Sequence, residues 1–128
     1  MPLQSHVSPQ EPREDQFRPV RNDFFVKPHG GFWTSSWVDN TSGWIEWCKS
    51  EMPHWLGDSK IWLLQPKTGL RVYTVDCLAD LEQVFGEYPY SHPKIQEVNA
   101  MCRSYLRYID FEAMSQHYDA MHLTEEGQ

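Results

Sequence analysis

The sequence lacks the features that mark secreted, membrane-spanning and zinc-binding proteins. Its three cysteines, Cys48, Cys77 and Cys102, are widely spaced and form no CxxC pair, so neither a disulfide framework nor a zinc knuckle is expected. No apolar run approaches the roughly 18 residues that a membrane span needs. Residues 1–15 show no basic stretch followed by an apolar one, as a secretory signal would. We therefore expect a cytoplasmic protein with no membrane partner.

Motifs with a defined chemistry are also missing. None of the six histidines falls at HxxxH or HExxH spacing, so the sequence does not predict a metal site. It contains no P-loop, GxGxxG or GxSxG motif. Any enzymatic activity must therefore be argued from other residues.

Basic residues are scarce in the second part of the chain. Residues 1–75 hold eight acidic and eight basic side chains, whereas residues 76–128 hold ten acidic and three basic ones, which gives the net charge of −7. Nucleic-acid backbones need clustered Lys and Arg, so we expect no such partner. The acidic excess would suit a basic protein, or serve solubility alone.

Aromatic residues are abundant by contrast, with six Trp, six Tyr and six Phe among 128 residues. A chain of this length is large enough to bury one core, so we predict a single domain over residues 1–128. So many rings indicate either a core built from aromatic side chains or a stacking surface.

Hydrophobic spacing predicts strands and helices that do not alternate regularly. The expected strands cover 2–8, 31–37, 60–65, 70–75 and 120–124, and the expected helices cover 44–55, 77–87, 95–109 and a short segment capped by Asp110. The turn at 66–69 predicts a hairpin between 60–65 and 70–75. The fold class that follows is α+β.

The segment 9–30 is predicted to be a long ordered loop. It holds four prolines, and Phe17, Val20, Phe24 and Phe25 would anchor it. A loop of this length inside a small domain is usually functional or disordered, and the phenylalanines favour the packed, functional case.

A tryptophan stripe follows the loop. Trp44, Trp47, Cys48, Met52 and Trp55 fall on one face of the predicted helix 44–55. Apolar stripes at this spacing mark buried faces. We therefore expect these tryptophans to be core residues, and Trp47→Ala to cost about 3 kcal/mol or more.

The segment KPHGGFWTSSW, residues 27–37, is the most unusual part of the chain. Gly30 and Gly31 let a backbone approach a ligand closely, Trp33 offers a ring for stacking, and Thr34 and Ser35 offer hydroxyls. These features fit a nucleotide, and they equally fit an edge strand after a tight turn.

The chain resembles a family of small bacterial and phage proteins with an ADP-ribosyltransferase-like fold. The matching segments are His6–Pro9, Lys27–Ser35, Trp44–Cys48, Arg71–Asp76, Ile109–Met114 and Tyr118–Thr124. The resemblance implies two short antiparallel sheets around a cleft, with flanking helices. It also implies that this cleft binds NAD through His6, Gly31, Trp33, Thr34 and Ser35.

The resemblance implies transfer of ADP-ribose from NAD to a protein acceptor, a reaction that needs a carboxylate at the reacting ribose. Family members continue after the HLT strand into one that carries this carboxylate, whereas this sequence stops at Gln128. Glu125 and Glu126 are then the candidate catalytic residues. The alternative is a non-catalytic, phage-type inhibitor that binds a host defence complex and keeps only the scaffold.

Overall fold

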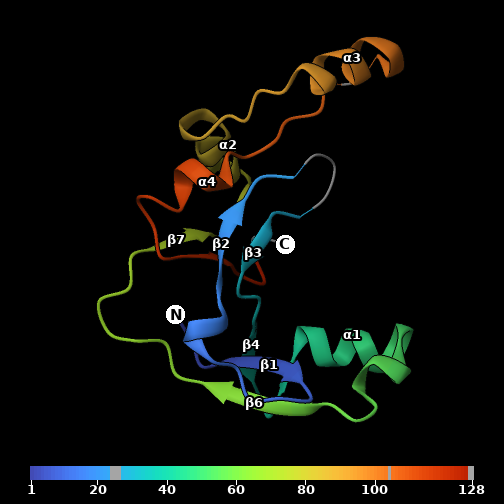
Figure 1. Ribbon diagram of the computed structural model, residues 1–128, viewed down its shortest axis with the longest axis vertical. Coiled ribbons are helices and arrows are strands. Elements are labelled where there is room, and N and C mark those ends of the chain that lie inside the picture. The colour runs from blue at the N-terminus through green and yellow to red at the C-terminus, as the bar shows by residue number, and fades with distance from the viewer. Residues whose placement is uncertain (24–26, 104, 127–128) are drawn as a thin grey trace. The chain divides into compact units, whose positions relative to one another are not determined.

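The computed structural model describes residues 1–23, 27–103 and 105–126, and its fold class is α+β, as predicted (Figure 1). The chain divides into two compact units. The first comprises Met1–Pro19 and Gly30–Leu70, and the second comprises Val20–His29 and Arg71–Gln128. That the two units form one domain stays a prediction.

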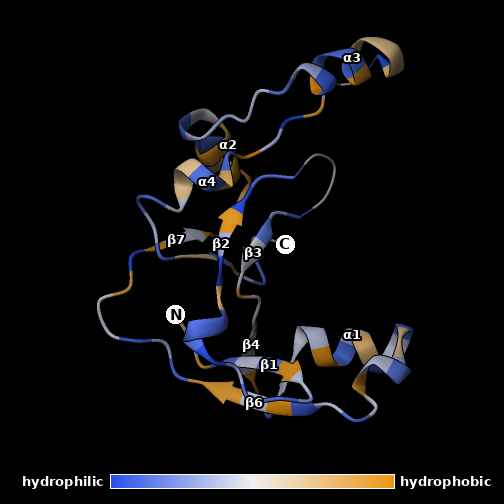
Figure 2. Cartoon of the chain, in the orientation of Figure 1, coloured by the Kyte–Doolittle hydropathy of each residue, from blue (hydrophilic) through white to orange (hydrophobic). Residues whose placement is uncertain are grey.

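The first unit contains a four-stranded sheet with the order β5-β4-β1-β6. Its strands are β1 (Gln4–Ser8), β4 (Ser35–Val38), β5 (Thr41–Ser42) and β6 (Lys60–Leu64). β1 pairs antiparallel with both β4 and β6, and places His6 opposite Trp62. The strands predicted over 2–8 and 60–65 form at Gln4–Ser8 and Lys60–Leu64. The arrowhead end of β6 is strongly hydrophobic (Figure 2).

The segment 9–37 is more structured, and more interrupted, than predicted. The expected loop contains a 3₁₀ turn (Glu14–Gln16) and β2 (Arg18–Arg21), which pairs with β3 (His29–Gly31). Gly30 has φ of 73° and lies so close to β2 that a Cβ there would be 2.1 Å from the carbonyl oxygen of Pro19. The predicted strand 31–37 is interrupted, since β3 ends at Gly31 and β4 begins only at Ser35. Phe24 and Phe25 lie outside the described residues.

The helix α1 (Gly43–Glu51) begins within one residue of the predicted start at 44, but it ends at Glu51 rather than at 55. Ser42 caps it by accepting a hydrogen bond from the Ile45 amide, and Pro53 starts a separate 3₁₀ helix, η2 (Pro53–Leu56). Ile45 and Cys48 are its buried residues. These modest side chains let the helix lie close to the sheet, where the Trp44 amide donates to Ser35 Oγ over 3.3 Å.

The predicted burial of the tryptophan stripe is confirmed for Cys48 and wrong for its three tryptophans. Trp44, Trp47 and Trp55 keep 41%, 43% and 47% of their surface exposed. A helix of nine residues buries only a narrow face, and here Ile45 and Cys48 occupy it. The tryptophans lie on the adjacent face, where they contact one another.

The second unit is built on a two-stranded parallel pair. β7 (Val72–Val75) runs beside β8 (Ala120–Leu123). The predicted hairpin between 60–65 and 70–75 is therefore wrong, since β6 pairs with β1 and β7 with β8. For the same reason, this pair is not the second antiparallel sheet that the resemblance implied.

Three helices complete the second unit, namely α2 (Leu78–Glu87), α3 (Pro93–Cys102) and α4 (Phe111–Met114). Tyr73, Val75, Val84 and Met114 form its core. α3 ends earlier than the periodicity predicted, because Arg103 takes a left-handed conformation with φ of 50°. Tyr105, placed on the predicted helical stripe, is 94% exposed.

Asn22 fastens its own segment of the second unit to the start of α4. Its Oδ1 accepts from the amides of Phe111 and Glu112 at 2.8 and 3.3 Å, and its Nδ2 donates to Asp110 Oδ1 at 2.8 Å. Its own amide donates to Glu112 Oε1 at 3.0 Å. The Asn22 side chain therefore satisfies two of the amides that the first turn of a helix leaves without intrahelical partners, and Asp110 Oδ1 accepts from a third, that of Ala113, at 3.0 Å.

The chain carries a natural probe for each unit. All six tryptophans lie between residues 33 and 62, in the first unit, and all six tyrosines lie between residues 73 and 118, in the second. Tryptophan fluorescence, excited at the red edge of the absorption band where tyrosine does not absorb, therefore reports unfolding of the first unit. The tyrosine signal in near-ultraviolet circular dichroism reports unfolding of the second unit. Coincident transitions in urea would support a single cooperative domain.

We expect Ile45→Ala to lower the tryptophan-reported free energy of unfolding by about 2–5 kcal/mol, because it opens a cavity beneath α1. Trp47→Ala should cost less, because that ring is half exposed. Urea titrations of both variants measure the difference. A larger loss for Trp47→Ala would show that the ring is buried.

We expect Asn22→Ala to lower the tyrosine-reported free energy of unfolding by about 1–3 kcal/mol, since it leaves several polar groups without their partner. Gln116→Ala, at an exposed position just after α4, is the matched control. If both variants unfold like the parent chain, Asn22 does not fasten α4.

Candidate functional site

The candidate site begins with the alternation of side chains along β1. Successive strand residues point to opposite faces of a sheet, so Gln4 and His6 share one face and Ser5 and Val7 share the other. α1 packs on the Ser5 side, because Ser5 pairs with Ser35, whose Oγ contacts the start of α1. His6 is thus on the face that α1 leaves open.

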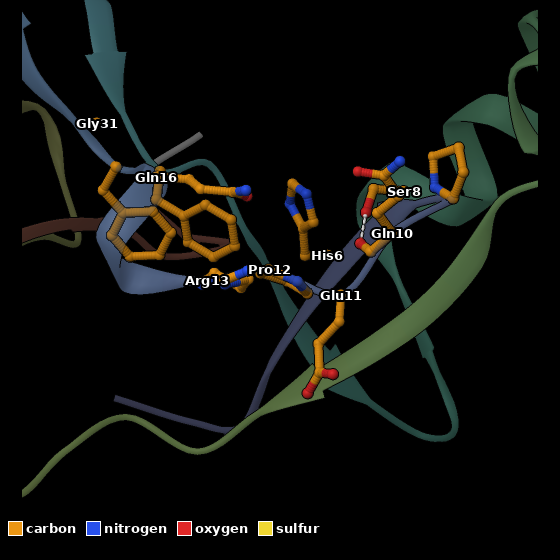
Figure 3. Close-up of a pocket in the computed structure, with 11 residues that line it drawn as sticks. His6, Ser8, Gln10, Glu11, Pro12, Arg13, Gln16 and Gly31 are labelled. Atoms are coloured by element: carbon orange, nitrogen blue, oxygen red, sulfur yellow. Dashed lines mark hydrogen bonds between the residues drawn. The ribbon is translucent and has the colours of Figure 1, made fainter.

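An open groove of about 360 Å³ lies beside His6 (Figure 3). All of its walls belong to the first unit. The lining residues come from β1, the chain that follows it, and the end of β3: His6, Ser8, Pro9, Gln10, Glu11, Pro12, Arg13, Gln16, Phe17, Gly31 and Phe32. Ser8 Oγ donates to the Gln10 carbonyl and holds the turn that forms one wall.

One wall of the groove is aromatic. The His6 and Phe32 rings are 4.5 Å apart between centroids and are inclined at 37°. Phe32 in turn stacks on Phe17 at 4.5 Å and 17°. Phe32 was not singled out from the sequence, and Phe17 was named only as a loop anchor, because contacts between residues this far apart in the chain leave no local pattern.

A hydrogen bond to the backbone determines which tautomer the neutral His6 ring adopts. Its Nδ1 lies 2.9 Å from the carbonyl oxygen of Trp33. A carbonyl can only accept, so Nδ1 carries the proton in this contact. In the neutral ring the lone pair is therefore on Nε2, which is left able to accept a hydrogen bond from a ligand hydroxyl.

The structure brings some of the predicted cofactor-binding residues together and separates others. His6 and Gly31 both line the groove. Trp33 contributes its carbonyl to His6, while its side chain is 54% exposed. Thr34 Oγ1 donates to Gln4 Oε1 at 2.8 Å, and Ser35 Oγ accepts from the Trp44 amide on the α1 side of the sheet. Neither hydroxyl is among the groove residues.

The predicted catalytic carboxylates belong to the other unit. Glu125 and Glu126 are exposed residues in the turn after β8. Glu11 supplies the carboxylate among the residues that line the groove. It was not singled out from the sequence. It is exposed, and its side chain points away from His6 (Figure 3). No sequence signal marked it, because a single Glu in a proline-rich segment is typical of any surface loop.

Asp119, the acidic residue that immediately precedes β8, has a structural partner. Its Oδ2 accepts from the amide and Nε of Arg71 at 2.8 and 3.1 Å, and its Oδ1 accepts from Nη2 at 2.9 Å. These hydrogen bonds lower the pKa of Asp119 from 3.8 to about 2. They also hold the residues that precede β7 and β8 side by side.

The described parts of the chain hold no cluster of three or more His, Cys, Asp or Glu side chains that could bind a metal ion. In the same residues, no helix has both the length and the apolar character required to cross a bilayer. The chain matches none of the protein-family models, curated proteins or solved structures with which it was compared. The functional argument therefore depends on the geometry of the groove.

We expect the Arg71–Asp119 pair to make the stability of the second unit pH-dependent below pH 4. Because the folded-state pKa is lowered, the stabilisation is complete above 3.8 and is lost as the pH falls towards 2. Asp119→Asn should therefore be less stable than the parent chain at neutral pH, and the difference should shrink across this window.

Tyrosine-monitored unfolding at several pH values measures this difference, with the exposed Asp76→Asn as control. A difference that stays constant between pH 4 and 2 would contradict the role assigned to the pair.

Proposed function

We propose that the chain is an NAD-binding protein of the ADP-ribosyltransferase-like type, with the groove beside His6 as its cofactor site. The observation that carries the proposal is the fixed His6 ring, held between Phe32 and the Trp33 carbonyl at the groove wall. The proposed fold is the ADP-ribosyltransferase-like arrangement, for which the curled antiparallel sheet of the first unit is one required part.

The size and lining of the groove fit part of NAD. Ligand pockets usually occupy about 300–1,000 Å³, and a volume of 360 Å³ suits the nicotinamide ribose half better than the whole dinucleotide. The aromatic wall offers rings for stacking. The lone pair of His6 Nε2 can accept from a ribose hydroxyl, and Gly31 presents backbone without a side chain.

A cation is available for the pyrophosphate. Arg13 lines the groove, and its Nη2 lies 2.8 Å from Asp15 Oδ2 in an exposed ion pair. Exposed pairs of this kind contribute little stability, so Arg13 can leave Asp15 at small cost to meet a phosphate. Arg and phosphate then form charge-assisted hydrogen bonds.

The proposed chemistry is transfer of ADP-ribose to a nucleophile of a protein acceptor. The bond from ribose C1′ to nicotinamide breaks, nicotinamide leaves with the bonding electrons, and the acceptor nucleophile forms the new bond at C1′ and loses its proton. A carboxylate must be held close to its working position for this step. Glu11, Glu125 and Glu126 are all exposed, so we expect transfer to be weak compared with binding.

The second candidate function is that of a non-catalytic inhibitor that binds a host protein complex. The exposed tryptophans of α1 and η2 specifically favour it, because a soluble surface rarely presents such large rings together. NAD binding and partner binding are compatible, because they use different residues of the first unit, whereas the inhibitor hypothesis excludes the transfer step.

We expect isothermal calorimetry to detect NAD binding to the chain, and His6→Ala to weaken it at least about tenfold by removing the hydrogen-bond acceptor and the stacked ring. His54→Ala, a histidine of the same unit outside the groove, is the matched control. Absence of binding by the folded parent chain, or equal binding by both variants, would refute the NAD proposal.

A further inference from the structure

Trp44, Trp47 and Trp55 form a cluster that we call the tryptophan surface. The ring centroids are 5.1 Å apart for Trp44 and Trp47, 5.9 Å for Trp44 and Trp55, and 5.8 Å for Trp47 and Trp55. Each side chain is more than 40% exposed. Three contacting indoles therefore present a continuous aromatic patch on α1 and η2 to the solvent.

The spacing of the rings decides which kind of group they can receive. Contacting rings leave no room between them, so the cluster is not a cage that encloses an ammonium group. Trp44 and Trp47 are nearly parallel, with an interplanar angle of 18°. The outer ring faces therefore suit a flat group that stacks on the patch from outside.

The charges beside the patch favour a cation. Glu51 follows Trp47 by four residues, so it lies one turn further along the same helix face. It is exposed, and the hydrogen bond found for it joins its Oε1 to the neighbouring Ser50 Oγ at 3.2 Å. Between residues 43 and 58 the sequence holds one basic side chain, Lys49, and it pairs with Glu46 at 3.3 Å. Asp58 adds a further exposed acidic side chain to this segment.

We propose that the tryptophan surface binds an arginine side chain in a basic segment of a partner protein. The guanidinium is flat and cationic, so it can stack on an indole face. Its N–H groups can at the same time donate to the Glu51 carboxylate in a two-pronged hydrogen bond. Lysine has the charge without the flat shape, so it should bind less well, and the acidic surroundings exclude a phosphate backbone.

This proposal does not depend on the NAD groove. α1 covers the face of the sheet that carries Ser5 and Ser35, whereas His6 lies on the opposite face. The arginine site and the groove are therefore separate within the first unit, and either proposal can fail without the other.

The test is a fluorescence titration with acetyl-Gly-Arg-Gly-Arg-Gly-amide, together with the citrulline and lysine versions of the same peptide. Citrulline keeps the flat shape and lacks the charge. We expect the arginine peptide to change the tryptophan emission and to bind roughly three- to tenfold more tightly than either counterpart. Raised salt should weaken binding, because the pairing is exposed.

Two variants locate the site. Glu51→Gln keeps the shape of the helix face and should reduce the preference for arginine over citrulline, and Trp47→Leu should weaken binding of the arginine peptide several-fold. Trp33→Leu is the matched control for Trp47→Leu, because Trp33 is an exposed tryptophan of the same unit that lies outside the tryptophan surface. Glu14→Gln is the matched control for Glu51→Gln. Calorimetry with NAD on Glu51→Gln and Trp47→Leu should show unchanged affinity.

Several outcomes would overturn the proposal. Equal affinity for the arginine and citrulline peptides, or an unchanged preference in Glu51→Gln, would mean that no guanidinium site exists there. Light scattering that shows a dimer abolished by Trp47→Leu would mean that a second copy of the chain covers the surface. Charge-independent binding of a neutral oligosaccharide, with no arginine preference, would assign the surface to a sugar.

Discussion

The first unit depends on the polar contacts between β1 and the segment that leads into β4. Gln4 and Ser5 are 5% and 2% exposed, and both are satisfied across the strand pair. Gln4 Oε1 accepts from Thr34 Oγ1, and Ser5 Oγ donates to the Ser35 carbonyl at 3.1 Å. Unpaired polar groups at these depths would each cost about 1–3 kcal/mol. These bonds therefore fix the register that places His6 beside the groove.

The same strand gives the two faces of the sheet different chemistry. On the His6 face, the groove combines an aromatic wall with polar and charged loop residues. On the Ser5 face, α1 is held by Ile45 and Cys48 and directs its tryptophans to solvent. A small-molecule site and a protein-binding surface can coexist in one small unit, because alternation along a strand separates them.

The second unit follows another principle. Its core is apolar, with Val75 and Val84 fully buried, and polar contacts fasten its edges. Asn22 secures the start of α4, and the Arg71–Asp119 pair aligns the beginnings of β7 and β8. Most of the negative charge of the chain lies here, and it remains solvated apart from such pairs. The groove and the exposed tryptophans both lie in the first unit.

Local signals in the sequence determined the α+β class, the positions of β1, β6, β7 and β8, and the cap of α4 at Asp110. These depend on neighbouring residues, through periodicity and capping. The sequence also singled out His6 and Gly31, which line one groove. Only the tertiary structure decided strand pairing and burial, because both depend on which distant segments meet. Three features could therefore not be read from the sequence. The strand β6 pairs with β1 rather than with β7, and the rings of Phe17 and Phe32 form the groove wall beside His6. The tryptophans of the stripe are exposed.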